Sequence, residues 1–218
     1  MIRSLITNPD EFMRRLSRRP GIRREFLLVL LFGVLGAIGN AYIGQELQSA
    51  MDITAIRFQV IGFAIDPVLD LLGIWLIYSL GSHYLADSFY RGRSPPMKVM
   101  KVAAWALFPL GLAYGVRSAV VWFIMQDTTI DELVGDEQAG IEEAFDLVTE
   151  GVLLDPLFVV ALIAVVAGIA ASGYWLMLGI QHVKDLDREQ ALRVVGVLVV
   201  LHIAYVVWRR SDLLFNLA

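Results

Sequence analysis

Four polar residues that could bind or pair with charge lie inside otherwise apolar stretches: Asp70, Arg117, Asn40 and His202. A guanidinium near the bilayer centre costs between about 3 and well over 10 kcal/mol, so it indicates either a functional site or a buried partner. If each stretch is a helix that crosses the bilayer, a rise of about 1.5 Å per residue puts all four in the same outer half, at depths of about 6 to 13 Å. The sequence therefore predicts that Asp70 pairs with Arg117, with Asn40 and His202 nearby.

This polar cluster has two interpretations. In the functional one, Asp70 and Arg117 bind an ion or a zwitterionic headgroup in a cavity open to the outside, and His202 responds to pH. In the structural one, a buried ion pair determines which helices touch and in what register. We favour the structural one, because interrupted helices and inverted repeats, which are common in transporters, are absent apart from a single proline, Pro109. An Arg117→Ala variant that stays folded but is inactive would contradict it.

The rest of the sequence offers little for catalysis. It has no cysteine, which excludes thiol catalysis and thiolate metal sites, and it lacks the H-E-x-x-H, G-x-S-x-G, P-loop and G-x-G-x-x-G patterns. Glu142 and Glu143 are similar to the paired glutamates of intramembrane metalloenzymes, but no histidine lies near them. His83 and His182 each precede an aspartate by three or four residues, as is ordinary at helix C-termini. We expect no enzyme activity, no cofactor and no metal site.

The elements that hold the cluster follow from composition. Hydrophobic residues make up 57% of the 218 residues, more than a soluble domain contains, so we expect an all-α integral membrane protein. Five apolar stretches can cross a hydrocarbon core of about 30 Å as helices. Asp66–Pro67 and Asp155–Pro156 each pair an N-cap residue with a proline at the first helical position, and they mark the starts of the second and fourth spans. The spans cover about residues 26–44, 67–86, 102–125, 156–181 and 193–208.

Three local features refine the spans. Residues 53–65 are apolar but contain Arg57 and Gln59, so they form either an interfacial helix or an extension of the second span, and we prefer the interfacial helix. Pro109 removes one backbone hydrogen bond and should kink the third span. Small residues at four-residue spacing predict close helix packing and fit a homo-oligomer. They are Gly33, Ala37 and Ala41 in the first span, Gly111, Gly115 and Ala119 in the third, and Ala164, Gly168 and Ser172 in the fourth.

Basic residues predict the orientation, because loops rich in lysine and arginine resist translocation. The N-terminal segment (residues 1–25) and the connections after spans two and four hold 14 of the 18 lysines and arginines. We therefore expect a multi-pass protein of the cell membrane with a cytoplasmic N-terminus and an external C-terminal tail (211–218). The loop 126–155 is then external and strongly acidic. A solvated helix on the membrane surface explains it, and calcium binding is a lesser hypothesis because EF-hand spacing is absent.

The N-terminal segment predicts an amphipathic helix from about Pro9 to Arg18, capped by Asn8. Phe12, Met13 and Leu16 share one side of it and arginines the rest. Such a helix suits an anionic membrane surface, although we favour the simpler explanation that it is an ordinary basic flank that fixes topology. With the loop after span two it would form a basic face for anionic lipid headgroups or an acidic protein partner. This predicted face comprises Arg14, Arg15, Arg18, Arg19, Arg91, Arg93, Lys98 and Lys101.

Three segments carry a resemblance: "NPDEFMRRL", "KVMKVAAWALFPLGL" and "YWLMLGIQHVKDLDREQALRVVGVLVV". In this order the chain resembles the Yip domain family of five-helix membrane proteins. The last segment is the most telling, because Trp175, Leu178, Gly179 and then the run Glu189–Leu192 are similar to the family's entry to the final span. The excess of arginine over lysine and the acidic loop are typical of proteins from very salty surroundings. They suggest a prokaryotic, haloarchaeal member.

The resemblance implies five spans and a role in organising membranes without chemistry. Eukaryotic relatives interact with Rab-type GTPases, but their N-terminal Asp-Leu-Trp-Gly-Pro motif is absent from this sequence. We expect a non-enzymatic scaffold or membrane-shaping protein that contacts lipid, has a protein partner or self-associates, and binds no nucleic acid. A small transporter or channel component built on Asp70, Arg117 and His202 is the alternative. An intramembrane enzyme is the least favoured hypothesis.

Overall fold

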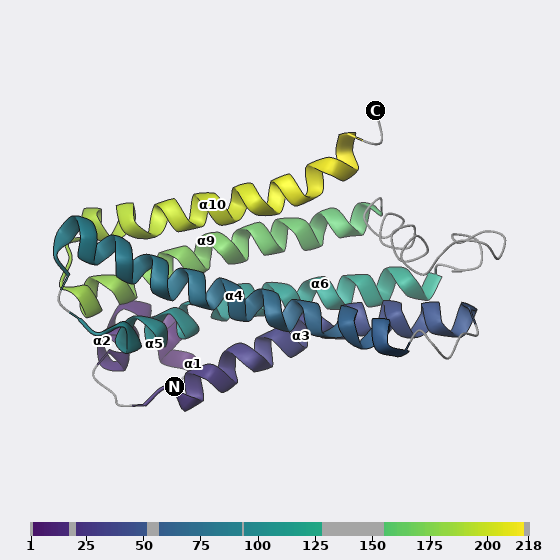
Figure 1. The fold of residues 1–218 in the computed structure, drawn as a ribbon, viewed down its shortest axis with the longest axis horizontal. Coiled ribbons are helices and arrows are strands. Elements are labelled where there is room, and N and C mark those ends of the chain that lie inside the picture. The colour runs from purple at the N-terminus through teal and green to yellow at the C-terminus, as the bar shows by residue number, and fades with distance from the viewer. Residues whose placement is uncertain (1, 18–20, 52–56, 93, 128–154, 216–218) are drawn as a thin grey trace.

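The computed structural model describes residues 2–17, 21–51, 57–92, 94–127 and 155–215. No strand occurs among them, and their long helices run side by side with the two termini towards opposite ends (Figure 1). Five stretches of the described residues are long and apolar enough to cross a membrane, which confirms the predicted all-α membrane architecture. The helices are α1 (Ile2–Thr7), α2 (Pro9–Leu16), α3 (Arg23–Met51), α4 (Arg57–Tyr90), α5 (Pro96–Ala106), α6 (Phe108–Asp127), α9 (Pro156–Lys184) and α10 (Arg188–Phe215).

Small residues allow these helices to pack closely. α3 packs against α4 and α6, α6 also packs against α9, and α10 packs against α9 and α4. A Cβ added at Gly33 would lie 2.8 Å from the Cα of Val68, and one at Gly168 would lie 3.2 Å from the Cα of Leu110. The spacing predicted both approaches. Gly115, in contrast, has no described residue within 4 Å of such a Cβ, so the described residues use the predicted seam of the third span only in part.

One of the two predicted helix starts is correct. Asp155 caps α9, and its Oδ1 accepts a hydrogen bond of 2.7 Å from the backbone N–H of Leu157. Asp66–Pro67 does not begin a helix, because α4 runs without interruption from Arg57 and contains Pro67, but the candidate span within α4 begins at Ile65, close to the predicted start of the second span. The described part of the preferred interfacial helix, residues 57–65, is continuous with α4 and is not a separate helix, and its place at the membrane interface stays a prediction. Pro67 is buried against Gly36 of α3, and extending an existing helix requires less free energy than nucleating a new one.

The third span is interrupted. α5 ends at Ala106 and α6 begins at Phe108, with Leu107 in a turn between them and Pro109 in the first turn of α6. The first backbone N–H groups of a helix have no partner within it. Leu110 donates its N–H to the hydroxyl of Ser172 on α9, over 3.2 Å. A side chain of the neighbouring span thus satisfies one donor that the interruption leaves free.

Candidate functional site

Three residues of the predicted polar cluster meet at one cavity. The cavity has a volume of about 520 Å³, within the range of small-molecule sites, and α4, α6, α9 and α10 form its walls. Asp70 reaches it from α4, Arg117 from α6 and His202 from α10. Most of the remaining lining is apolar. The fourth residue, Asn40 on α3, contacts Arg117 from behind this lining.

Arg117 is fixed by hydrogen bonds between α6 and α3. Its Nη2 donates to Oδ1 of Asn40 over 3.0 Å, and the next residue, Ser118, donates its hydroxyl to the carbonyl of Leu35 over 2.8 Å. Asp70 and Arg117 both make further interactions within the protein. The direct pairing of these two residues stays a prediction, whereas the contact with Asn40 is an observation. The guanidinium is thus held at the cavity wall by a helix that does not line the cavity.

His202 lines the cavity beside Tyr78, a residue that the sequence did not single out. The hydroxyl of Tyr78 on α4 lies 2.9 Å from Nδ1 of His202, and both side chains are buried. One turn away, a Cβ at Gly81 would lie 2.9 Å from the side chain of Leu198, so α4 and α10 are also close there. Tyr78 follows Asp70 by eight residues, which puts the two on similar faces of α4. In the sequence, this spacing from Asp70 was the only indication that Tyr78 lies at the cavity.

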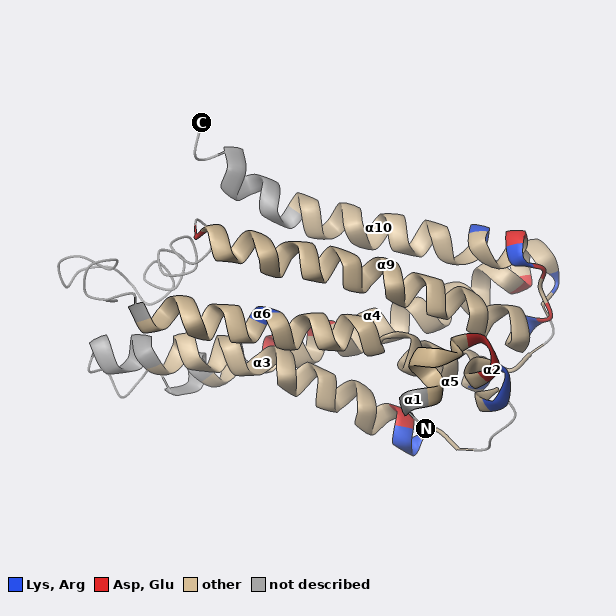
Figure 2. Cartoon of the chain, turned by 180° about the vertical axis from the view of Figure 1, so that it is seen from behind, with Lys and Arg blue, Asp and Glu red and all other residues tan. Residues whose placement is uncertain are grey.

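Charged residues gather at the end of the bundle that carries α1, α2 and α5 (Figure 2). We call it the basic end and define it by its exposed residues Arg14, Arg15, Arg91 and Lys98. The sequence placed Lys101 on the same face, which is wrong, because Lys101 is only 2% exposed. α5 has α2, α3, α4 and α9 around it, so part of it must point inwards. Arg18, Arg19 and Arg93 lie outside the described residues.

A second buried cation lies beneath this end. The side chain of Lys184, at the end of α9, is 0% exposed. Its Nζ donates to the carboxylate of Asp87 and to the carbonyl of Ser94, the latter over 3.1 Å, and lies 2.5 Å from Nδ1 of His83. The cluster joins α4, α9 and the connection before α5. The sequence analysis assigned His83 to helix capping. It did not identify Lys184 as a buried cation, because the partners of Lys184 lie about 100 residues away along the chain.

The N-terminal helix α2 is amphipathic, as predicted, but protein covers its apolar side. Phe12, Met13 and Leu16 are buried, and the ring of Phe12 meets that of Trp105 on α5 at a centroid distance of 5.1 Å. The helix packs chiefly on α9 and also touches α5. This apolar side is therefore not available for insertion into lipid, and only the polar side faces outwards.

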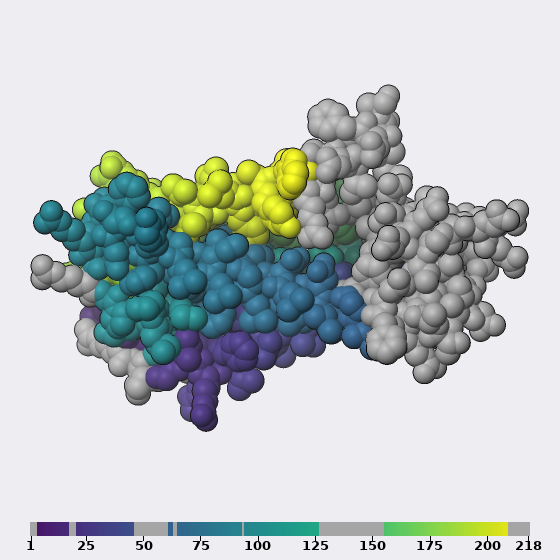
Figure 3. Space-filling view, in the orientation of Figure 1, coloured from purple at the N-terminus to yellow at the C-terminus, as the bar shows by residue number. Residues whose placement is uncertain are grey.

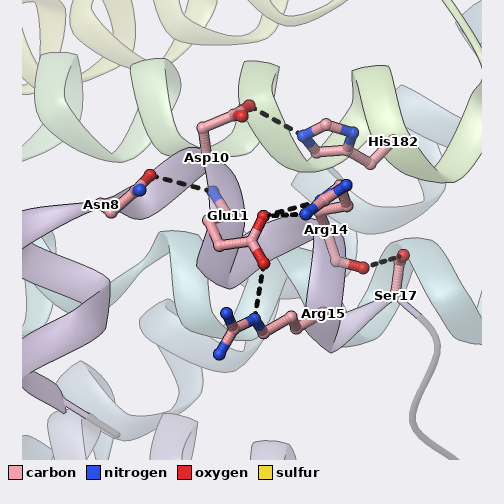
Figure 4. A network of polar contacts seen from close by, with 7 residues as sticks. All are labelled: Asn8, Asp10, Glu11, Arg14, Arg15, Ser17 and His182. Carbon is pink, nitrogen blue, oxygen red and sulfur yellow. Dashed lines mark hydrogen bonds and ion pairs between the residues drawn. The ribbon is translucent and has the colours of Figure 1, made fainter.

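Polar contacts hold α2 in place (Figure 4). Asp10 lies 2.8 Å from Nε2 of His182 on α9, a pairing that local spacing could not predict. Glu11 accepts hydrogen bonds from Nε of Arg15 at 2.6 Å and of Arg14 at 2.7 Å. These two guanidinium groups, Arg15 first, lower the pKa of Glu11 below its usual value. Glu11 therefore neutralises part of the positive charge on the exposed side of α2.

The predicted acidic loop lies almost wholly outside the described residues, as do Glu142 and Glu143, so its calcium hypothesis stays a prediction. Within the described part of the chain, no group of three or more histidine, aspartate or glutamate side chains is arranged to hold a metal ion.

Comparison with known proteins gives one match. The family model of the Yip1 domain matches residues 3–209, which includes α2 and all five candidate spans. No curated protein and no solved structure matches the chain.

Proposed function

The chain belongs to the Yip1 domain family, and from this premise we propose that it is a non-enzymatic membrane scaffold whose basic end recruits anionic surfaces. The observation that carries this proposal is the docking of α2. Because Phe12 and Met13 are buried in the protein, the helix holds a fixed orientation and presents Arg14 and Arg15 outwards. A docked helix of this kind forms a rigid platform, not a lipid-inserting wedge.

The charge distribution supports a cytoplasmic position for this platform. Loops rich in arginine and lysine stay on the cytoplasmic side, and the inner leaflet carries anionic lipids. Each basic residue close to such a surface contributes about 1 kcal/mol. Arg14, Arg15, Arg91 and Lys98 are exposed there, partly offset by Glu11. The surface suits anionic headgroups or an acidic segment of a protein partner.

A tethering assay tests the proposal. The protein is placed in nanodiscs of neutral lipid, and binding of free anionic vesicles is measured at increasing salt. Because each arginine contributes about 1 kcal/mol, we expect Arg14→Gln with Arg15→Gln to weaken binding roughly tenfold or more. Glu11→Gln removes a negative charge from the same surface and should strengthen the binding of anionic vesicles. Binding that ignores both changes and the salt concentration would contradict a lipid-facing role, and crosslinking in native membranes then tests for a protein partner.

The cavity favours a second candidate function, passage of a small solute through the bundle. The observation behind it is the convergence of Asp70, Arg117 and His202 on one cavity in a chain of five spans. Ionisable residues inside a membrane frequently mark transport pathways. Solute flux into proteoliposomes that is lost in Asp70→Asn would support this candidate, and the absence of flux for every ion tested would remove it.

A further inference from the structure

The cavity opens sideways between α4 and α10. Leu69 and Ile77 on α4, and Leu201 and Tyr205 on α10, line the cavity and are also exposed on the outside of the bundle, Ile77 and Leu201 at 61% each. α4 and α10 are close at the Tyr78–His202 contact. Figure 3 shows these two helices bordering each other on one face, α4 in blue and α10 in yellow. The opening therefore lies along the sides of two candidate membrane spans.

An opening at this position faces the hydrocarbon of the bilayer, so it favours ligands that are already dissolved there. The flanks of both spans face hydrocarbon, and a polar solute would have to cross that hydrocarbon to enter. A lipid is already there, and its chain can lie along the apolar walls while its polar part enters the cavity. The cavity thus has the chemistry of an amphipathic ligand, with apolar surfaces at the entrance and charged groups inside.

The charges inside the cavity narrow the class of lipid. Arg117 carries five N–H donors in a planar fork that matches a phosphate, and one of them binds Oδ1 of Asn40. Asp70 on the opposite helix is an acceptor for an ammonium group. We propose that this cavity binds one zwitterionic phospholipid, with its phosphate at Arg117, its primary ammonium at Asp70 and an acyl chain between α4 and α10.

This headgroup adds to the contacts that both residues already make within the protein. An anionic headgroup would match the charge of Arg117 but bring a second negative charge close to Asp70, and a neutral diacylglycerol would match neither charge. The proposal does not depend on the platform formed by α2, which lies at the other end of the bundle. An experiment can therefore contradict the lipid-binding proposal without contradicting the proposed function of the basic end, and the reverse.

Native mass spectrometry of delipidated full-length protein tests the proposal, with phosphatidylethanolamine and phosphatidylglycerol as competing probes. We expect one phosphatidylethanolamine per chain and a preference for it of at least tenfold. Gly73 lines the cavity and has nothing within 4 Å of an added Cβ, so Gly73→Leu should fill the space and lower binding at least tenfold. Gly196 on α10 is equally open but does not line the cavity, so Gly196→Leu is the matched control and should bind normally.

The charge variants separate the two headgroup contacts. Asp70→Asn should remove the preference for phosphatidylethanolamine while phosphatidylglycerol still binds, and Arg117→Gln should weaken both lipids. Thermal unfolding of each variant shows whether it is folded. Equal binding of the two lipids by the unmodified protein, or equal binding by folded Gly73→Leu and Gly196→Leu variants, would overturn the proposal. Vesicle tethering by the basic end would be unaffected in either case.

Discussion

Tyr78 and His202 join α4 to α10 through a hydrogen bond of 2.9 Å between the phenol and Nδ1, with their rings edge to face at a centroid distance of 5.7 Å. Tyr78→Phe removes this bond and keeps the ring. Hydrogen bonds between membrane helices contribute about 0.6 to 1.7 kcal/mol, so we expect a loss of stability of about 1 kcal/mol in detergent unfolding. Tyr174→Phe, at an exposed tyrosine of α9, is the control and should change little. Equal effects of the two variants would mean that the bond contributes nothing.

The ion pair between buried Lys184 and partly exposed Asp87 predicts an asymmetry between two variants. Asp87→Asn leaves the fully buried ammonium with only neutral acceptors, and removing one partner of a buried pair costs about 3 kcal/mol or more. Lys184→Met leaves a carboxylate whose side chain is 40% exposed and can be hydrated, so we expect a loss of about 1 to 2 kcal/mol. Equilibrium unfolding of both variants and of the double variant measures the difference. A larger loss in Lys184→Met would show that the ammonium is not the costly partner.

The interruption of the third span gives a test with two buried serines. Ser172→Ala leaves the N–H of Leu110 without its acceptor, which should cost about 1 to 3 kcal/mol. Ser82 is also fully buried, but its hydroxyl has no hydrogen-bond partner among the described residues. Ser82→Ala should therefore be neutral or slightly stabilising. Thermal unfolding of the two variants side by side decides the matter, and similar losses would remove the role given to Ser172.

Acid should loosen the N-terminal helix. The hydrogen bonds from Arg15 and Arg14 lower the pKa of Glu11, so the stability that they provide is present above the unfolded-state pKa of about 4.3. It is lost as the pH falls further, through the lower pKa of the folded state. Hydrogen exchange of the α2 amides, corrected for intrinsic rates, should therefore speed up below about pH 4. In the Glu11→Gln variant, the acceleration of exchange at low pH should be smaller. The Asp10→Asn variant, studied beside it, isolates the contribution of the contact with His182. An unchanged response would assign it to another group.

Helix starts were predictable from the sequence where they depend only on residues that are neighbours along the chain. The cap at Asp155–Pro156 depends on one side chain and the next two residues, so its pattern was sufficient. The identical pattern at Asp66–Pro67 lies inside α4, where Pro67 packs against Gly36 of α3. A capping motif states that a helix can begin there. It does not state that the preceding residues are not helical.

The partners of buried charges were harder to predict than their depths. Depth along a span follows from counting residues, and it brought Asp70, Arg117 and His202 to one cavity. Asn40 lies at a similar depth, and only the packing of α3 on α6 makes it the residue that binds Arg117. Counting also treated Lys101 as a surface charge, because a one-dimensional pattern cannot show that α5 is surrounded by other helices.

The turn at Leu107 divides the third crossing into two rods that both pack against α3 and α9. The short rod, α5, is tied to α4, where the indole of Trp75 donates to the carbonyl of Met100 over 2.8 Å, and it also supports α2. The long rod, α6, packs chiefly on α3 and α9. Because α9 packs against α2 and against both rods, a force applied at α2 would be transmitted through α9 to the whole length of the third crossing.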